Sequence, residues 1–247
     1  MNTKHLILFA AIVGFTSCTE LENTLNTANQ VMGNGSTEKK LTNEEVIRGL
    51  REALSVGTNN SSSSASKADG FLKNPLIFIP FPPDAIKVKE KVEAVGMKNQ
   101  VDKFVETMNH GAEEACKESA PIFLNAITSM SIGDGFNILN GPDNAATQYL
   151  QDKTSNELYA TFKPKVQNAL KTVKLTDYWN PLITKYNQLT ALTGGEKINP
   201  DLDDYVTKGA MKGLFTLIAD EEKKIRKDPM ARVSDILKTV FGSLDNK

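Results

Sequence analysis

Residues 199–242 read "NPDLDDYVTKGAMKGLFTLIADEEKKIRKDPMARVSDILKTVFG", and this stretch decides the fold class. It opens with Asn199-Pro200, a typical helix start, because asparagine caps a helix well and proline fits its first turn. Apolar side chains then recur at helical spacing. Asp228-Pro229 repeats the start signal, and Gly242 is a stop signal. The stretch therefore predicts a long helix to about Lys227 and a last, shorter helix after it.

Helical signals of the same kind extend over most of the chain. Thr42 with Glu45 forms a capping box in front of an apolar stripe, and Thr154 with Glu157 forms another. Pro164 should kink the helix that follows the second box. Together these signals predict helices from 42 to about 56, 84–96, 99–118, 121–130, 131–141, from 143 onward, 154–170 and 176–189.

Two segments depart from the helical pattern. Residues 57–70, "GTNNSSSSASKADG", are small and polar and predict a flexible loop. In the next segment Ile77, Phe78 and Ile79 lie between prolines, which cannot donate to a β-ladder, and predict an extended or edge-strand segment. The predicted fold class is all-α: an irregular bundle of about eight to nine helices with one short extended or β segment near 71–82.

The other end of the chain carries a signal for export. A short apolar run follows Lys4 and is too short to cross a bilayer, which takes about 20 residues. It ends in "FTSC", which resembles a bacterial lipobox except that Phe15 stands where leucine is usual. We therefore expect a signal peptide at 1–17 and a lipidated Cys18, with an ordinary secretory signal as the alternative. Two or three acyl chains would hold such a protein firmly on a membrane.

The predicted boundaries follow from this signal. Residues 18–40 are polar and predict a lipidated tether, 41–242 form the helical domain, and 243–247 form a short tail. Thr19 is not the aspartate that retains many lipoproteins at the inner membrane, so the outer membrane is the expected location. The sequence leaves open whether the domain faces the periplasm or the surface.

Composition excludes several function classes. The chain has 29 basic and 30 acidic residues, so its charges nearly cancel. Removal of residues 1–17 would remove one basic residue, Lys4, and no acidic residue. Because nucleic-acid binding needs a basic excess or stripe, no nucleic-acid partner is expected. With Cys18 lipidated, Cys116 has no disulfide partner within the chain. Removal of the signal peptide takes away His5, so His110 is the only histidine of the predicted mature protein. No phosphate-binding or nucleophile motif is present, so we expect no cofactor and no metal.

Several strings resemble one known family. They are "DGFLKNPLIFIPFP", "DNAATQYLQDKTSNELYATFKP", "YWNPLITKYN" and residues 199–242. Together they resemble a bacterial family catalogued as domain of unknown function 4197 (DUF4197), over roughly residues 41–242. The resemblance implies a mostly helical exported protein or lipoprotein. It implies no activity, substrate or catalytic residue.

Two clusters of polar residues are candidate sites that a structural role explains better. Glu106, His110, Glu113 and Glu114 could hold a metal, but on a helical wheel they lie opposite the apolar stripe, and Cys116 lies at its edge as a buried thiol. Asp201, Asp203 and Asp204 complement a helix dipole and lack the register of a calcium loop. Aromatic residues could line a cleft, although core packing explains their spacing as well: Tyr149, Tyr159, Tyr178, Trp179 and Tyr186.

A third cluster is the sharper candidate. Glu221 falls in the middle of the apolar face of the long helix, and Glu222 lies at its edge, four residues before Arg226. A carboxylate that faces a core must be paired, hydrogen-bonded or protonated. The chain has only four arginines, Arg48, Arg51, Arg226 and Arg232. We expect Glu221 to meet Arg232 from the last helix, or Arg48 or Arg51 from the first. Three interpretations of Glu221 are open: it belongs to a buried ion pair, it lines a polar ligand pocket, or it lies at an exposed helix end.

These features favour a non-catalytic helical module in the bacterial envelope, anchored to a membrane through its lipid, which binds a protein, lipid or small ligand. One alternative is a hydrolase of envelope glycans with Glu221 or Glu222 as the acid, because such chemistry needs only two carboxylates. Another is a carrier of an apolar ligand, which needs a cavity between helices.

Overall fold

The computed structural model describes residues 42–172 and 201–242, and between them residues 179, 183, 184, 186–188, 191, 192 and 197–199. The predicted signal and tether at 1–40 lie outside these residues. So do the tail at 243–247 and much of the helix predicted at 176–189.

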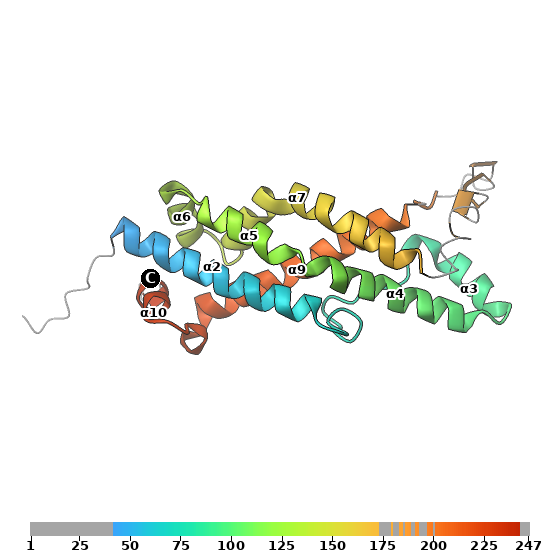
Figure 1. Ribbon diagram of the computed structural model, residues 1–247, viewed down its shortest axis with the longest axis horizontal. Helices are drawn as coiled ribbons and strands as arrows, with labels where there is room; N and C mark the ends of the chain where they lie inside the picture. The colour runs from blue at the N-terminus through green and yellow to red at the C-terminus, as the bar shows by residue number, and fades with distance from the viewer. Residues whose placement is uncertain are drawn as a thin grey trace, which may run out of the picture. The chain divides into compact units, whose positions relative to one another are not determined.

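The described residues form helices and turns and contain no β-strand, which confirms the all-α prediction (Figure 1). None of these helices is both long and apolar enough to span a membrane. Their bounds are α2 (Asn43–Ser66), α3 (Ile86–Ala94), α4 (Lys98–Cys116), α5 (Ser119–Thr128), α6 (Ile132–Leu139), α7 (Ala145–Leu170), α9 (Leu202–Lys227) and α10 (Asp235–Gly242), with 3-10 turns η1 (Pro83–Ala85) and η2 (Pro229–Ala231).

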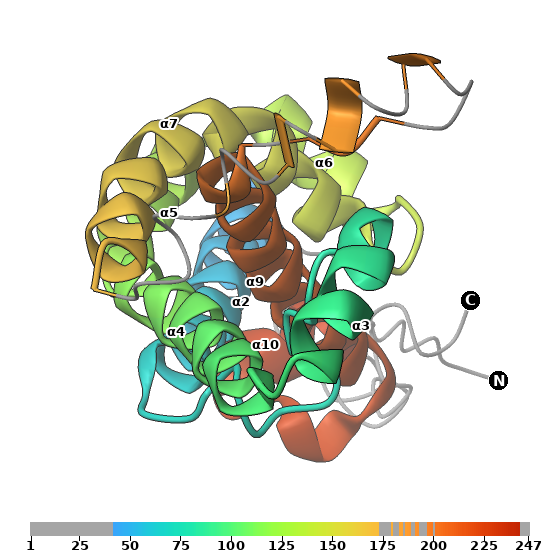
Figure 2. The same cartoon turned by 90° about the vertical axis from the view of Figure 1, so that its right-hand side faces the viewer.

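Helix α9 is the central element of the bundle. It packs against α2, α4 and α7, and the end-on view shows it among the other helices (Figure 2). Its buried stripe includes Val206, Leu214 and Ile218, as the helical spacing requires. The helix begins slightly later than predicted, because the side chain of Asp201 accepts from the backbone of Asp204 and caps it.

The loop predicted at 57–70 is wrong for most of its length, because α2 continues to Ser66. The small residues form a buried helix face: Gly57, Ser61 and Ala65 recur every four residues, and so do Thr58 and Ser62. Ser62 accepts a 2.8 Å hydrogen bond from Ser119 of α5. Small side chains let neighbouring helices approach closely, so composition typical of a loop here serves helix packing.

Two predicted helix starts are also wrong. Thr154 does not cap a helix, because its hydroxyl donates to the Leu150 carbonyl inside the continuous helix α7. An unbroken buried stripe explains this continuity: Leu150, Leu158, Phe162, Val166 and Leu170. Pro164 lies inside this helix. At the C-terminal end, Asp228-Pro229 starts only the 3-10 turn η2, and α10 begins at Asp235.

The extended segment predicted near 71–82 forms turns and irregular chain instead of a strand. Its apolar side chains are nevertheless buried, among them Phe71, Ile77 and Ile79. With no neighbouring strand, the backbone of Ile79 pairs with a side chain: Asn109 of α4 accepts from its N–H and donates to its carbonyl, both at 2.9 Å. This pairing satisfies the polar groups that a β-ladder would otherwise bind.

Candidate functional site

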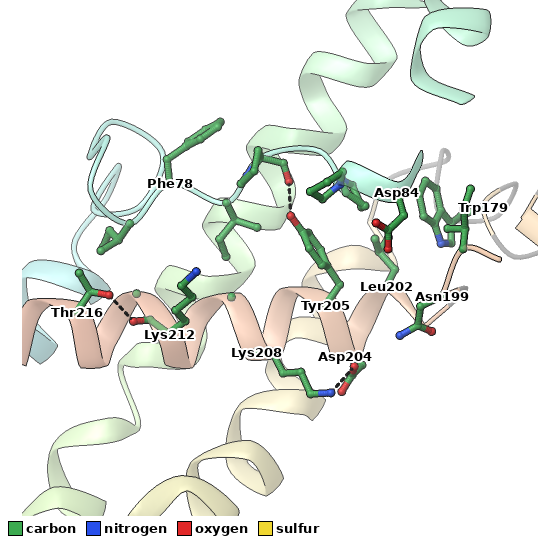
Figure 3. A pocket seen from close by; sticks show the side chains of 18 of the residues that line it. Phe78, Asp84, Trp179, Asn199, Leu202, Asp204, Tyr205, Lys208, Lys212 and Thr216 are labelled. Carbon is green, nitrogen blue, oxygen red and sulfur yellow. Dashed lines mark hydrogen bonds and ion pairs between the residues drawn. The ribbon is translucent and has the colours of Figure 1, made fainter. Parts of the chain in front are cut away.

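A groove of about 530 Å³ lies between the irregular segment 76–84 and helix α9 (Figure 3). One wall is the irregular segment 76–84, and the other is the first half of α9. Trp179 and residues 198–199 close one end. A volume of this size falls in the range of about 300–1,000 Å³ that is typical of small-molecule sites.

The wall of the groove is fixed by polar contacts from two helices. Asn109 holds Ile79 as described, and the hydroxyl of Tyr205 on α9 donates to the Pro80 carbonyl at 3.1 Å. The phenol of Tyr205 is protonated at neutral pH and can donate, and burial raises its pKa further above the ordinary value of 10. The wall is therefore preformed rather than a loose loop.

Two glycines of α9 let the wall lie close to the helix. A Cβ atom at Gly213 would lie 2.6 Å from Cε1 of Phe71, and one at Gly209 would lie 3.0 Å from Cδ1 of Ile79. Real Cβ atoms almost never come as close as the first distance, and the second is tighter than most real contacts, so a side chain at either position would require Phe71 or Ile79 to shift. The spacing of four residues places both glycines on one helix face.

Apolar and aromatic side chains dominate the lining. Phe81, Phe104 and Trp179 form an aromatic cluster with ring centroids 5.4–5.7 Å apart, and Trp179 lines the groove. At the other end, Leu76 is 58 % exposed and Phe78 is 39 % exposed. Exposed large apolar residues beside a preformed hollow are characteristic of ligand-binding surfaces.

The charged residues of the groove differ in their pairing. Lys208 bonds to Asp204 at 2.9 Å and points away from segment 76–84, whereas Lys212 rises toward it (Figure 3). Asp204 also accepts from the Tyr159 hydroxyl at 2.8 Å. Burial works against the ionisation of Asp204, but the hydrogen bonds from Lys208 and Tyr159 outweigh it and hold its pKa low.

A buried glutamate anchors the chain that leads into this wall. Glu113 of α4 is 5 % exposed and accepts from the backbone N–H groups of Phe71 and Leu72 at 3.0 and 3.2 Å. His110 lies 2.8 Å from its other oxygen. The prediction that Glu113 faces solvent is wrong, because the turn before the groove covers this face of the helix and brings two N–H donors to it.

His110 makes the stability of this anchor pH-dependent. The hydrogen bond with Glu113 holds the pKa of His110 above its ordinary value of 6.5. A raised pKa means that protonation favours the folded state below pH 6.5, and that this stabilisation is lost as the pH rises through the folded-state pKa. We expect the thermal midpoint of the protein to fall as the pH rises above 6.5.

A His110→Gln variant supplies the control for this pH dependence. It removes the titrating group while it keeps a hydrogen-bonding side chain, so its midpoint should be flatter over the same interval. Differential scanning calorimetry at several pH values compares the two proteins. An equal slope in both would show that other groups cause the pH dependence.

Among the described residues, Glu221 does not contact an arginine, so the predicted pairing is wrong. Glu221 accepts from Asn60 of α2 at 2.9 Å and binds Lys224 at 2.9 Å, and its side chain is 22 % exposed. Arg48 is exposed, and Arg51 donates to the Met130 carbonyl at 2.7 Å. Arg232 is buried and donates to the carbonyls of residues 225 and 226 at the end of α9.

The buried carboxylate is Glu222, the neighbour of Glu221. Its side chain is 8 % exposed and pairs at 2.9 Å with Arg226, which is 7 % exposed. It also accepts from the backbone N–H groups of Ala146 and Thr147 and from the Thr147 hydroxyl, at 2.7–2.9 Å. Glu222 therefore caps α7 from another helix, and Arg226 links it to the Ile138 carbonyl at 2.8 Å.

The surroundings of Glu222 indicate a structural role. The adjoining cavity measures about 20 Å³, room for roughly one water molecule. The two carboxylate oxygens of Glu222 already accept hydrogen bonds from Arg226, two backbone amides and a hydroxyl. This geometry gives no support to Glu222 as the acid of a hydrolase.

The remaining candidate residues make contacts that stabilise the fold or are buried in the core. Asp201 caps α9, and Lys163 binds it at 3.0 Å. Cys116 is fully buried, and burial raises the pKa of its thiol. Within the described residues, no three histidine, cysteine or acidic side chains gather as a metal site. Tyr149 donates to the Ala126 carbonyl, Tyr186 is half-buried, and Tyr178 lies outside the described residues.

Sequence reasoning did not identify most of the groove. Two signals pointed to it: the glycines at 209 and 213, one helical turn apart in a long helix, and the prolines at 80, 82 and 83. The first pattern is typical of a close approach by another chain segment. Neither signal shows that Asn109 and Tyr205 come from distant positions to hold the wall.

Comparison with known proteins gives one finding. The family model described as "Protein of unknown function (DUF4197)" matches residues 40–242. No curated protein and no solved structure matches the chain.

Proposed function

The chain belongs to the DUF4197 family of proteins of unknown function, and from the geometry of its groove we propose that it is a non-catalytic binding protein of the bacterial envelope. The ligand is a small, elongated apolar molecule that lies between segment 76–84 and α9. The observation that carries the proposal is the preformed groove of about 530 Å³.

Three properties of the groove support an apolar ligand. Its lining is mainly aliphatic and aromatic, and it ends at Trp179. Its wall is held by hydrogen bonds from Asn109 and Tyr205, so little ordering is needed when a ligand enters. Its outer edge exposes Leu76 and Phe78 to water, and covering them would gain about 25 cal/mol per Å² of apolar surface.

Trp179 provides the readout for the test, because it is the single tryptophan of the chain and lines the groove. We expect the neutral alcohol decanol to change its fluorescence in a saturable way. A Leu76→Asp substitution places a charge at the apolar edge and should weaken binding by about tenfold, since 1.4 kcal/mol corresponds to that factor.

Leu124→Asp is the matched control. Leu124 lies on α5, is 53 % exposed against 58 % for Leu76, and does not line the groove. It should leave the decanol affinity unchanged. No saturable change in the wild-type protein, or equal weakening by the two substitutions, would contradict the proposal.

The proposal places this domain on a membrane through Cys18. Its support is the sequence: a short apolar run after Lys4 that ends in "FTSC", followed by a polar tether at 19–40. We propose lipidation of Cys18 and an outer-membrane location, with Thr19 in the position that directs sorting. Labelling cells with a palmitate analogue should mark the wild-type protein, and labelling of a Cys18→Ala variant would argue against this attachment site.

A further inference from the structure

We infer that the ligand of the groove is an anionic amphiphile, a single alkyl chain with a carboxylate head group that binds Lys212. The inference rests on the proposed function, because it names the class of molecule that the same groove takes. The evidence for it is the position of two charged residues, Lys212 and Asp84, in a mainly apolar groove.

Lys212 is available to bind a ligand. Its side chain rises from α9 toward segment 76–84, in the space between Phe78 and Tyr205 (Figure 3). Its ammonium group makes no ion pair or hydrogen bond with the described residues. Asp204, an acidic residue of the same helix, is already bound by Lys208 and Tyr159 and does not pair with Lys212.

The other end of the groove has the opposite charge. Asp84 is exposed and lies beside Trp179 and Tyr205, on the far side from Lys212 (Figure 3). A carboxylate ligand is therefore attracted to the Lys212 end and repelled from the Asp84 end. This polarity orients the molecule, with its head at Lys212 and its alkyl chain along Tyr205 and Leu202 toward Trp179.

Lys212 is exposed in the free protein, so water screens its charge before a ligand arrives. A bound alkyl chain that lies along the apolar lining would cover one side of the ammonium and exclude water from that side. Hydrogen bonds to charged groups are stronger than those between neutral groups. We therefore expect a carboxylate to bind at least tenfold more tightly than a neutral molecule of the same length.

Decanoate and decanol separate charge from apolar surface, because they have the same chain length. Both are titrated below their aggregation concentrations with Trp179 fluorescence as the readout. The wild-type protein should bind decanoate at least tenfold more tightly than decanol. Lys212→Met removes the charge and keeps an unbranched side chain that is one atom shorter. It should bring the decanoate affinity to the decanol value while decanol binding stays unchanged.

Lys223→Met is the control, because Lys223 is an exposed lysine of the same helix that does not line the groove. It should preserve the preference for decanoate. Equal affinities for decanoate and decanol in the wild-type protein overturn the inference and leave the proposed function standing. Failure of both compounds to change Trp179 fluorescence overturns the inference and the proposed function together.

Discussion

Replacing Glu222 by alanine is expected to lower the free energy of unfolding by about 3–5 kcal/mol, the cost of breaking a buried ion pair from one side. The variant leaves Arg226 as a buried charge without its carboxylate. It also removes the acceptor for the N–H groups of Ala146 and Thr147 in the first turn of α7. Asn144 at the N-cap position offers no side-chain hydrogen bond in compensation.

Glu221→Ala is the matched control for this prediction. Glu221 is the adjacent residue of the same helix, and its contacts with Asn60 and Lys224 are partly exposed. The expected loss is at most about 1 kcal/mol, as for exposed pairs. Urea unfolding of both variants gives the comparison. Equal losses would show that Glu222 is not the carboxylate that joins α7 to α9.

Replacing Asn109 by alanine is expected to cost about 2–6 kcal/mol, because the N–H and the carbonyl of Ile79 both lose a buried partner, at about 1–3 kcal/mol each. The loss should be concentrated in the groove. Segment 76–84 should exchange its amide hydrogens faster, and decanol should bind more weakly, because the wall is then no longer held in place.

Asn99→Ala controls for the substitution itself. Asn99 lies on the same helix α4, is exposed, and its side chain makes no hydrogen bond with any described residue. It should change neither stability nor amide exchange in segment 76–84. If Asn109→Ala behaves like Asn99→Ala in both measurements, the wall of the groove does not depend on this side chain.

The helices were the predictable part of the structure. The capping box at Thr42, the apolar stripe of α9 and the Ser131 cap of α6 all act within one or two helical turns, so sequence pattern alone reveals them. Predictions failed where small residues pack between helices. The serines of α2 have the composition of a loop, and only their spacing of four residues indicates a buried face.

The candidate site was less predictable, because its contacts are distant in sequence. The helical wheel correctly placed a carboxylate near the core face of α9 but chose Glu221, and the buried group is its neighbour Glu222. The difference arises because the start of α7 supplies hydrogen-bond donors to Glu222. In the same way, Glu113 is buried because a turn forty residues earlier covers it.

The central claim is that an alkyl carboxylate binds between segment 76–84 and α9, and methyl NMR spectra recorded during a decanoate titration test it most directly. We predict saturable shifts of the methyl signals of Ile77, Ile79 and Leu202, which line the groove. Leu124 and Ile132 expose apolar surface elsewhere and should not shift. Shifts confined to Leu124 and Ile132, or the absence of any saturable shift, would contradict the account.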